Sequence, residues 1–104
     1  MGNNEHREYI DRLARVIQEL HGSGAVHINT ESVHEVFQGK TVWEGDVEVF
    51  SLTDESKATV CYAWSYQDGS VEHFVAVLNV PPVNTAADAV KAYIVGEAKK
   101  RKAN

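Results

Sequence analysis

Three ionisable side chains near the middle of the chain have the types that acid–base chemistry needs. His73 lies in the apolar stretch of residues 58–80, and histidine is the side chain whose ordinary pKa suits a general base near neutral pH. Asp46 and Glu48, in the preceding strand-like segment, would supply a carboxylate partner. These residues define one hypothesis, a small enzyme or ligand-binding cup in which a histidine and a carboxylate meet in an apolar pocket. A histidine packed against an interface fits the same pattern.

Aromatic residues alternate with small ones in residues 61–66, on the strand predicted to pair with that of His73, with Trp64 opposite His73. Because alternate residues of a strand share a face, one face of a predicted hairpin should carry most of them. We expect this face to bind an apolar ligand, a protein partner or a second copy of the chain. The residues predicted at this ligand-binding surface or interface are Tyr62, Trp64, Tyr66, His73, Val75 and Trp43.

The catalytic hypothesis depends on strand register. If residues 53–57 form the loop between two strands, Glu48 lies opposite Tyr62, and the acids and aromatics share one face of the sheet. A shift of one residue would place them on opposite faces. The sequence leaves both registers open.

The carboxylates of Glu44, Asp46 and Glu48 have the spacing of one strand face, which could hold a cation or provide two acids like those of a glycosidase. The same row is typical of a solvated edge strand whose charges prevent aggregation. The chain has five histidines, and none of their spacings matches a zinc-binding helix or finger. We therefore predict no metal site and no cofactor.

Cys61 is the only cysteine, so it cannot form a disulfide within the chain. It lies mid-strand between Val60 and Tyr62, without the cationic neighbour that a reactive thiolate needs. We expect a buried, poorly ionised thiol beneath a helix, opposite Ala76 on the neighbouring strand.

Composition limits the classes of function. The chain has 104 residues with 43% hydrophobic content, which fits a single domain over residues 1–104. Its formal net charge of -5 argues against general binding to nucleic acid or anionic membranes. No segment resembles a signal peptide or a membrane span, and the single cysteine fits a reducing compartment. We expect a cytoplasmic protein.

The strongest structural signal is the Asp68-Gly69 pair, which predicts a hairpin turn between two apolar strands. Residues 40–52 form the strand before them, where Gly45 indicates a bulge or a close backbone approach. Residues 25–29 read as a short edge strand or extended coil, and residues 31–38 as a two-turn helix with Val33, Val36 and Phe37 inward.

An amphipathic helix should begin the chain and end at His21-Gly22, since glycine suits the left-handed position after a helix. A second long helix should follow an N-cap at Asn84-Thr85 and run to about Lys100. The predicted fold is α+β: a three-stranded antiparallel meander, with a fourth short edge strand if residues 25–29 pair, and both long helices packed on one face.

Two resemblances go beyond these patterns. The order helix, three strands, helix is similar to double-stranded RNA-binding domains, but their lysine cluster is replaced here by residues 84–88, NTAAD, so RNA binding is not implied. The runs EVFQGKTVWEGDVEVFSL, CYAWS and VAVLNVPPV resemble a small uncharacterised bacterial protein family, which implies no particular activity.

The leading functional hypothesis is a small non-enzymatic binding or interaction module that forms a homodimer through its sheet. Both faces of the predicted hairpin are apolar, and two helices on one face would leave the other uncovered. The alternative is the enzyme or ligand-binding cup that uses His73.

Overall fold

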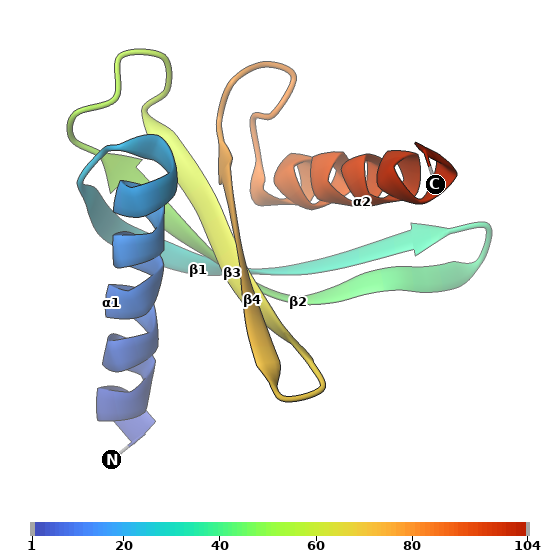
Figure 1. Cartoon of the computed structure of the whole chain (residues 1–104), viewed down its shortest axis with the longest axis horizontal. Coiled ribbons are helices and arrows are strands. Elements are labelled where there is room, and N and C mark those ends of the chain that lie inside the picture. The colour runs from blue at the N-terminus through green and yellow to red at the C-terminus, as the bar shows by residue number, and fades with distance from the viewer. Residues whose placement is uncertain (1, 104) are drawn as a thin grey trace.

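A meander of four strands flanked by two helices makes up residues 2–103, the part of the backbone that this computed structural model describes; side chains are described for residues 4–99 (Figure 1). Each strand is antiparallel to the next, in the order β1-β2-β3-β4. The α+β prediction is confirmed. The elements are α1 (Gly2–His21), β1 (Ala25–Phe37), β2 (Lys40–Leu52), β3 (Val60–Asp68), β4 (Val71–Leu78) and α2 (Ala86–Ala103).

The two hairpins of this sheet meet only over a short length. β2 pairs with β1 from end to end, but with β3 over just four residue pairs, from Glu48 opposite Ala63 to Ser51 opposite Val60. We call these four pairs the seam. Beyond it the β1–β2 and β3–β4 hairpins diverge (Figure 1). The backbone N–H of Ser65, just past the seam, donates to the hydroxyl of Tyr9 from α1 at 3.0 Å instead of to a strand.

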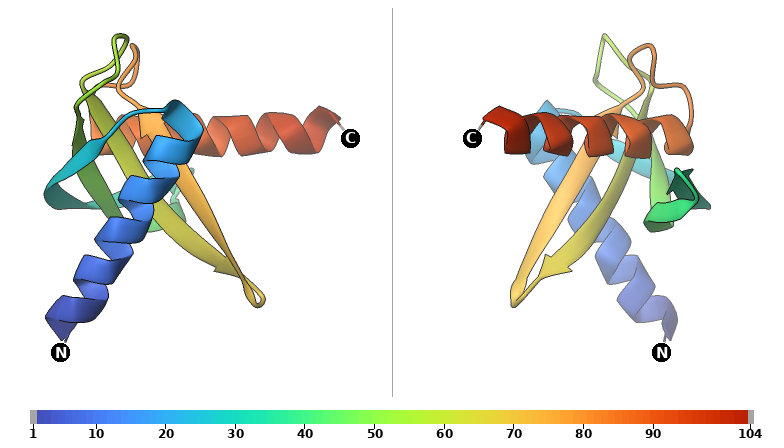
Figure 2. Two further views of the ribbon diagram at one scale, coloured as in Figure 1. Left: turned by 60° about the vertical axis from the view of Figure 1, so that its left-hand side comes forward. Right: turned by 90° about the vertical axis from the view of Figure 1, so that its right-hand side faces the viewer.

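The helices cover opposite faces of the sheet, as the two views of Figure 2 show. On one face Leu13 and Ile17 of α1 pack on Phe50 and Cys61. On the other, α2 packs through Ala86, Ala89 and Val90 against Val49, Tyr62 and Trp64. The prediction that both helices share one face is wrong, because consecutive residues of a strand point to opposite faces and here both sets are apolar.

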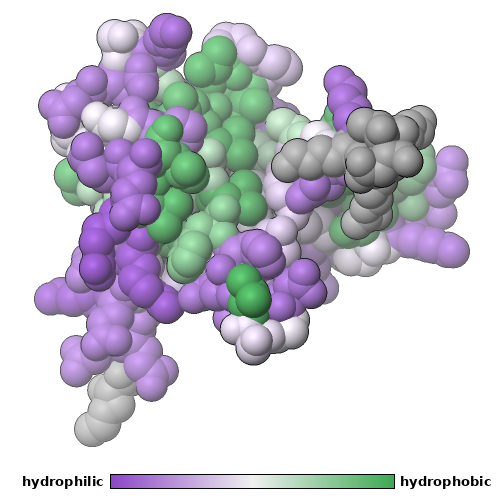
Figure 3. Space-filling model, in the orientation of Figure 1, coloured by the Kyte–Doolittle hydropathy of each residue, from purple (hydrophilic) through white to green (hydrophobic). Residues whose placement is uncertain are grey.

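Figure 3 shows the side of α1 that faces away from the sheet as hydrophilic, as the amphipathic pattern predicts. The helix ends at His21, and Gly22 follows with a φ of 70°. That predicted end is confirmed. Thr85 caps α2, since its hydroxyl accepts from the N–H of Asp88 at 3.1 Å. The carboxylate of Asp88 accepts in turn from the N–H of Asn84 at 3.0 Å.

Residues 31–38 do not form the predicted helix but continue β1 up to Phe37. The turn to β2 consists of Gln38 and Gly39, whose φ angles of 53° and 75° are both positive, as a tight hairpin turn requires. The spacing of Val33, Val36 and Phe37 is that of apolar residues on one side of a helix, which is why a helix was predicted. These residues form a strand because β1 pairs with β2 along the whole length of β2. Strand formation depends more on such pairing with a neighbouring strand than on local preference.

The β3–β4 turn lies one residue later than predicted. Asp68 pairs with Val71, so Gly69 and Ser70 form the turn. Every cross-strand partner moves by two residues: Cys61 faces Leu78 rather than Ala76, and His73 faces Tyr66 rather than Trp64. A shift of two leaves each side chain on its predicted face, because side chains alternate with a period of two.

Candidate functional site

Two of the residues predicted at the sheet surface lie in the core instead. Trp64 is 2% exposed and Tyr62 is 5% exposed, both beneath α2. The hydroxyl of Tyr62 donates to the carbonyl of Asn84 at 3.1 Å. Val75 is half-buried against the same cluster. The aromatic face is therefore covered at Tyr62 and Trp64 by this chain's own helix, and these two side chains offer no surface to a partner.

The residues of the catalytic hypothesis are not brought together. His73 lies 3.9 Å from Asp68, with both side chains exposed. Asp46 accepts a hydrogen bond from Ser32 at 3.0 Å. Glu48 pairs with Ala63 rather than Tyr62, which is the register that puts the acids and the aromatics on opposite faces. Asp46 and Glu48 therefore have partners of their own, away from His73.

Glu48 has a structural role on the face covered by α1. Its carboxylate is buried and accepts from the hydroxyl of Thr30 at 2.5 Å, while the Nε2 atom of His27 lies 2.8 Å away. The His27 ring also packs edge-on against Phe50, with centroids 5.4 Å apart. Buried polar groups need such hydrogen-bond partners, so this cluster links β1 to β2 at the seam.

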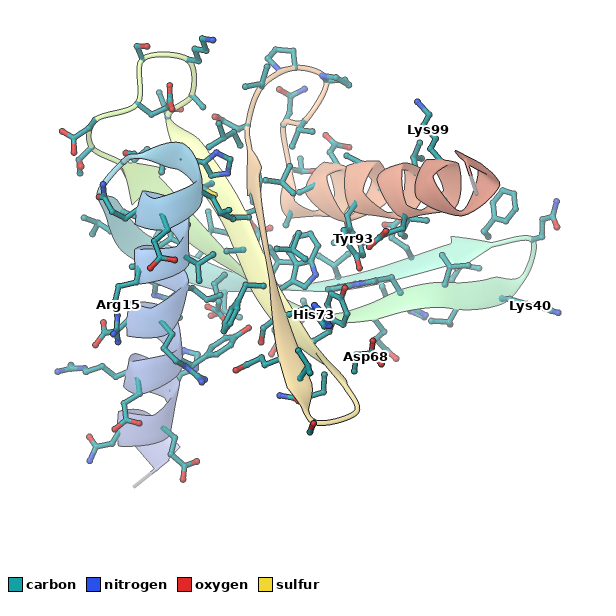
Figure 4. All side chains as sticks on the ribbon, in the orientation of Figure 1. Arg15, Lys40, Asp68, His73, Tyr93 and Lys99 are labelled. Atoms are coloured by element: carbon teal, nitrogen blue, oxygen red, sulfur yellow. The ribbon has the colours of Figure 1, made fainter. Side chains whose placement is uncertain are left out.

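A cleft opens where the two hairpins diverge, beneath the second half of α2. It has a volume of about 550 Å³. In Figure 4 Tyr93 points from α2 toward the hairpin that carries Asp68 and His73, whereas Lys99 points away. We call this the aromatic cleft, and it is lined by Val42, Trp43, Tyr66, Asp68, Tyr93, Ile94, Glu97 and Ala98.

The aromatic rings of this cleft stand at angles to one another. Tyr66 and Tyr93 have centroids 6.2 Å apart and planes tilted by 53°. Tyr66 stacks on His73 at 5.0 Å on the β3–β4 hairpin. Trp43 packs edge-on against the buried Trp64 at 5.5 Å, and its ring would come within 3.2 Å of a Cβ at Gly45. Gly45 pairs in regular register with Val33, so the predicted bulge is not found there, and the atoms close to it belong to the Trp43 side chain and not to another backbone.

The ionisable lining of the cleft is acidic. Asp68 is exposed and Glu97 is half-buried, and among the described residues that line the cleft there is no lysine or arginine. Burial, followed by the nearby Tyr66 hydroxyl and Glu97 carboxylate, raises the pKa of Tyr93 far above its ordinary value. The Tyr93 phenol therefore keeps its proton at alkaline pH values at which an exposed tyrosine ionises.

A second hollow, of about 610 Å³, lies between α2 and the tip of the β1–β2 hairpin. We call it the apolar groove. Its walls are formed by Val36, Phe37, Val42, Ile94, Val95 and Ala98, and its charged residues are Glu35, Lys91 and Lys99. Phe37 is 64% exposed and Val36 is 55% exposed. The groove and the aromatic cleft share three lining residues, Val42, Ile94 and Ala98.

Sequence reasoning selected Trp43, Tyr66 and His73 near the aromatic cleft but missed the residues that α2 contributes. Tyr93 and Glu97 are four apart, so they lie on the same side of a helix, and this spacing was the available signal. It could not be used without knowing that α2 crosses the β1–β2 hairpin. Phe37 was missed because residues 31–38 were predicted as a helix, and Val42 because the predicted strand of residues 40–52 then lacked β1 as its hairpin partner.

No family model matches the chain, and no curated protein or solved structure is significantly similar to it. The resemblance to a bacterial family stays a prediction. In the described part of the chain no helix is long and apolar enough to cross a membrane. The same residues contain no group of three or more His, Cys, Asp or Glu side chains placed to hold a metal ion.

Proposed function

We propose that this protein is a small non-enzymatic binding module that forms a homodimer through the apolar groove. The observation that carries the proposal is the exposure of Phe37 beside a hollow lined mainly by aliphatic side chains. Exposed apolar patches of this kind mark interaction sites, because leaving such a surface in water is unfavourable. The proposed partner surface consists of the tip of the β1–β2 hairpin and α2. The face that carries Trp64 is not part of it, because α2 covers that side chain.

The groove favours a second copy of the chain because it is complementary to itself. Phe37 projects at the end of β1, and the hollow that could receive an aromatic ring lies next to it. In a two-fold dimer the same surface meets itself, so each Phe37 would enter the groove of the other copy. The charged residues of the groove carry both signs, with Lys91 3.8 Å from Glu35, so two copies need not repel despite the net charge of -5.

Light scattering coupled to size-exclusion chromatography tests this proposal. The protein should elute as a dimer at tens of micromolar, and Phe37→Glu should convert it to a monomer by placing a charge in the buried contact. Circular dichroism should show unchanged secondary structure, because Phe37 is exposed within a single chain.

The matched control is Val71→Glu, which places the same charge on an exposed apolar residue of the other hairpin. This variant should remain a dimer. A monomeric wild-type protein, or a dimer that Val71→Glu dissociates while Phe37→Glu does not, would overturn the proposed interface. The second of these results would move the contact to the β3–β4 hairpin.

A further inference from the structure

We infer that the aromatic cleft is a binding site for an organic cation, specifically an alkylated ammonium group. The inference rests on three aromatic rings and two carboxylates that converge on one hollow. Its aromatic and acidic residues, Trp43, Tyr66, Asp68, Tyr93 and Glu97, do not line the apolar groove, although the two hollows share Val42, Ile94 and Ala98.

The rings provide the attractive surfaces. The face of an aromatic ring is the negative part of its quadrupole, so a cation within about 6 Å of the ring centroid is attracted to it. Tyr66 and Tyr93, tilted by 53° with centroids 6.2 Å apart, form two walls that meet at an angle. Trp43, anchored against the buried Trp64, supplies a third wall from the opposite hairpin. Quaternary ammonium groups are recognised by such walls of rings.

The charges around the cleft favour the same class of ligand. Glu97 on α2 and Asp68 at the end of β3 are its ionisable carboxylates, and His73 lies beside Asp68 at 3.9 Å. Among the residues whose side chains are described, the lysines of α2 are Lys91 and Lys99, and both line the apolar groove instead. A cation entering the cleft would therefore meet carboxylates and ring faces, whereas an anion would meet like charge.

The lining also discriminates among cations. A metal ion such as Ca²⁺ takes roughly six to eight oxygen ligands, and the cleft supplies two carboxylates separated by apolar and aromatic side chains. An alkylated ammonium group is weakly hydrated and can exchange water for ring faces and for Val42 and Ile94. The volume of about 550 Å³ lies within the range of roughly 300 to 1,000 Å³ that is usual for small-molecule sites.

Titration with choline, followed by calorimetry and by tryptophan fluorescence, tests the inference on the full chain. The comparison ligand is 3,3-dimethyl-1-butanol, which has nearly the same shape as choline but no charge. Choline should bind saturably and should bind at least roughly tenfold tighter than the neutral alcohol, because only the cation gains from the ring quadrupoles and carboxylates. Equal binding of both compounds, or no saturable binding of choline, would overturn the inference.

Substitutions locate the site. Glu97→Gln keeps the shape of the side chain and removes its charge, and should weaken choline binding several-fold without changing affinity for the alcohol. Tyr66→Leu should weaken it comparably by removing one ring, and its 38% exposure allows the change without unfolding the domain. Glu44→Gln makes the same change of charge at an exposed residue outside the cleft and should leave binding intact. Choline affinity that is unchanged in both Glu97→Gln and Tyr66→Leu would exclude this cleft as the site.

Discussion

At the scale of single residues, Cys61 shows how completely the α1 face is closed. The thiol has no exposed surface, and burial raises its pKa from an ordinary value of 9.0 to about 12. Sequence reasoning predicted this state, because a cysteine between apolar neighbours in a strand covered by a helix loses water on every side. Its cross-strand partner was misassigned, yet its burial was predicted correctly, since burial depends on the face and not on the exact partner.

The raised pKa predicts how stability depends on pH. Above pH 9 the thiol of the unfolded chain ionises while the folded thiol stays protonated, so the unfolded state binds fewer protons and the free energy of unfolding falls as pH rises toward 12. Urea unfolding of the wild type and Cys61→Ala measures this. The variant should be less stable by about 1 kcal/mol at pH 7.5, and this difference should shrink by about 1 kcal/mol at pH 10. A difference that is the same at both pH values would contradict a buried neutral thiol.

The burial of Glu48 cannot be predicted from the pattern of residues along its strand. With Glu44 and Asp46 it forms a regular acidic row, yet Glu48 alone of the three is buried, at 2% exposure. It lies in the seam, where α1 covers this face, whereas the other two lie beyond the seam. All three residues are acidic, so their types alone do not distinguish the buried one from the exposed ones. The position of the seam along β2, which decides the environment of each carboxylate, depends on pairing between distant segments.

At the scale of elements, the sequence predicted both long helices and the three later strands, because hydrophobic periodicity and capping residues are local signals. It missed the second half of β1, since Gln38-Gly39 is not among the common sequences of tight turns and gave no sign of a hairpin. Once residues 31–38 were assigned to a helix, the sheet was one long strand short, and neither the aromatic cleft nor the apolar groove could be derived.

The N-cap of α2 gives a prediction about an element. Thr85→Ala removes the hydroxyl that accepts from the N–H of Asp88, and should lower the free energy of unfolding by about 1 kcal/mol. Thr85→Ser retains the hydroxyl and should lower it by much less. Thermal unfolding of the three proteins provides the comparison. Equal losses for the two variants would show that the methyl group of Thr85, and not its hydrogen bond, stabilises this end of α2.

At the scale of the whole molecule, the two helices explain why both faces of the hairpin are apolar. Each face at the seam is covered by one helix of the same chain, so neither face there requires a second chain. The exposed apolar surface lies further out, in the apolar groove between α2 and the tip of the β1–β2 hairpin. Self-association is therefore proposed at the periphery of the sheet, and the proposed cation site lies in the angle between its two hairpins.

Within the described backbone, the four pairs of the seam are the only strand pairing between the two hairpins. Between the seam and the hairpin tips β2 and β3 are not paired with each other, so opening one hairpin tip should not require opening the other. Native-state hydrogen exchange should find the slowest amides at residues 48–51 and 60–63, with faster and mutually independent exchange in the two tips. A ligand held in the aromatic cleft touches Trp43 of one hairpin, Tyr66 of the other and Tyr93 of α2. Choline should therefore slow exchange in both tips together.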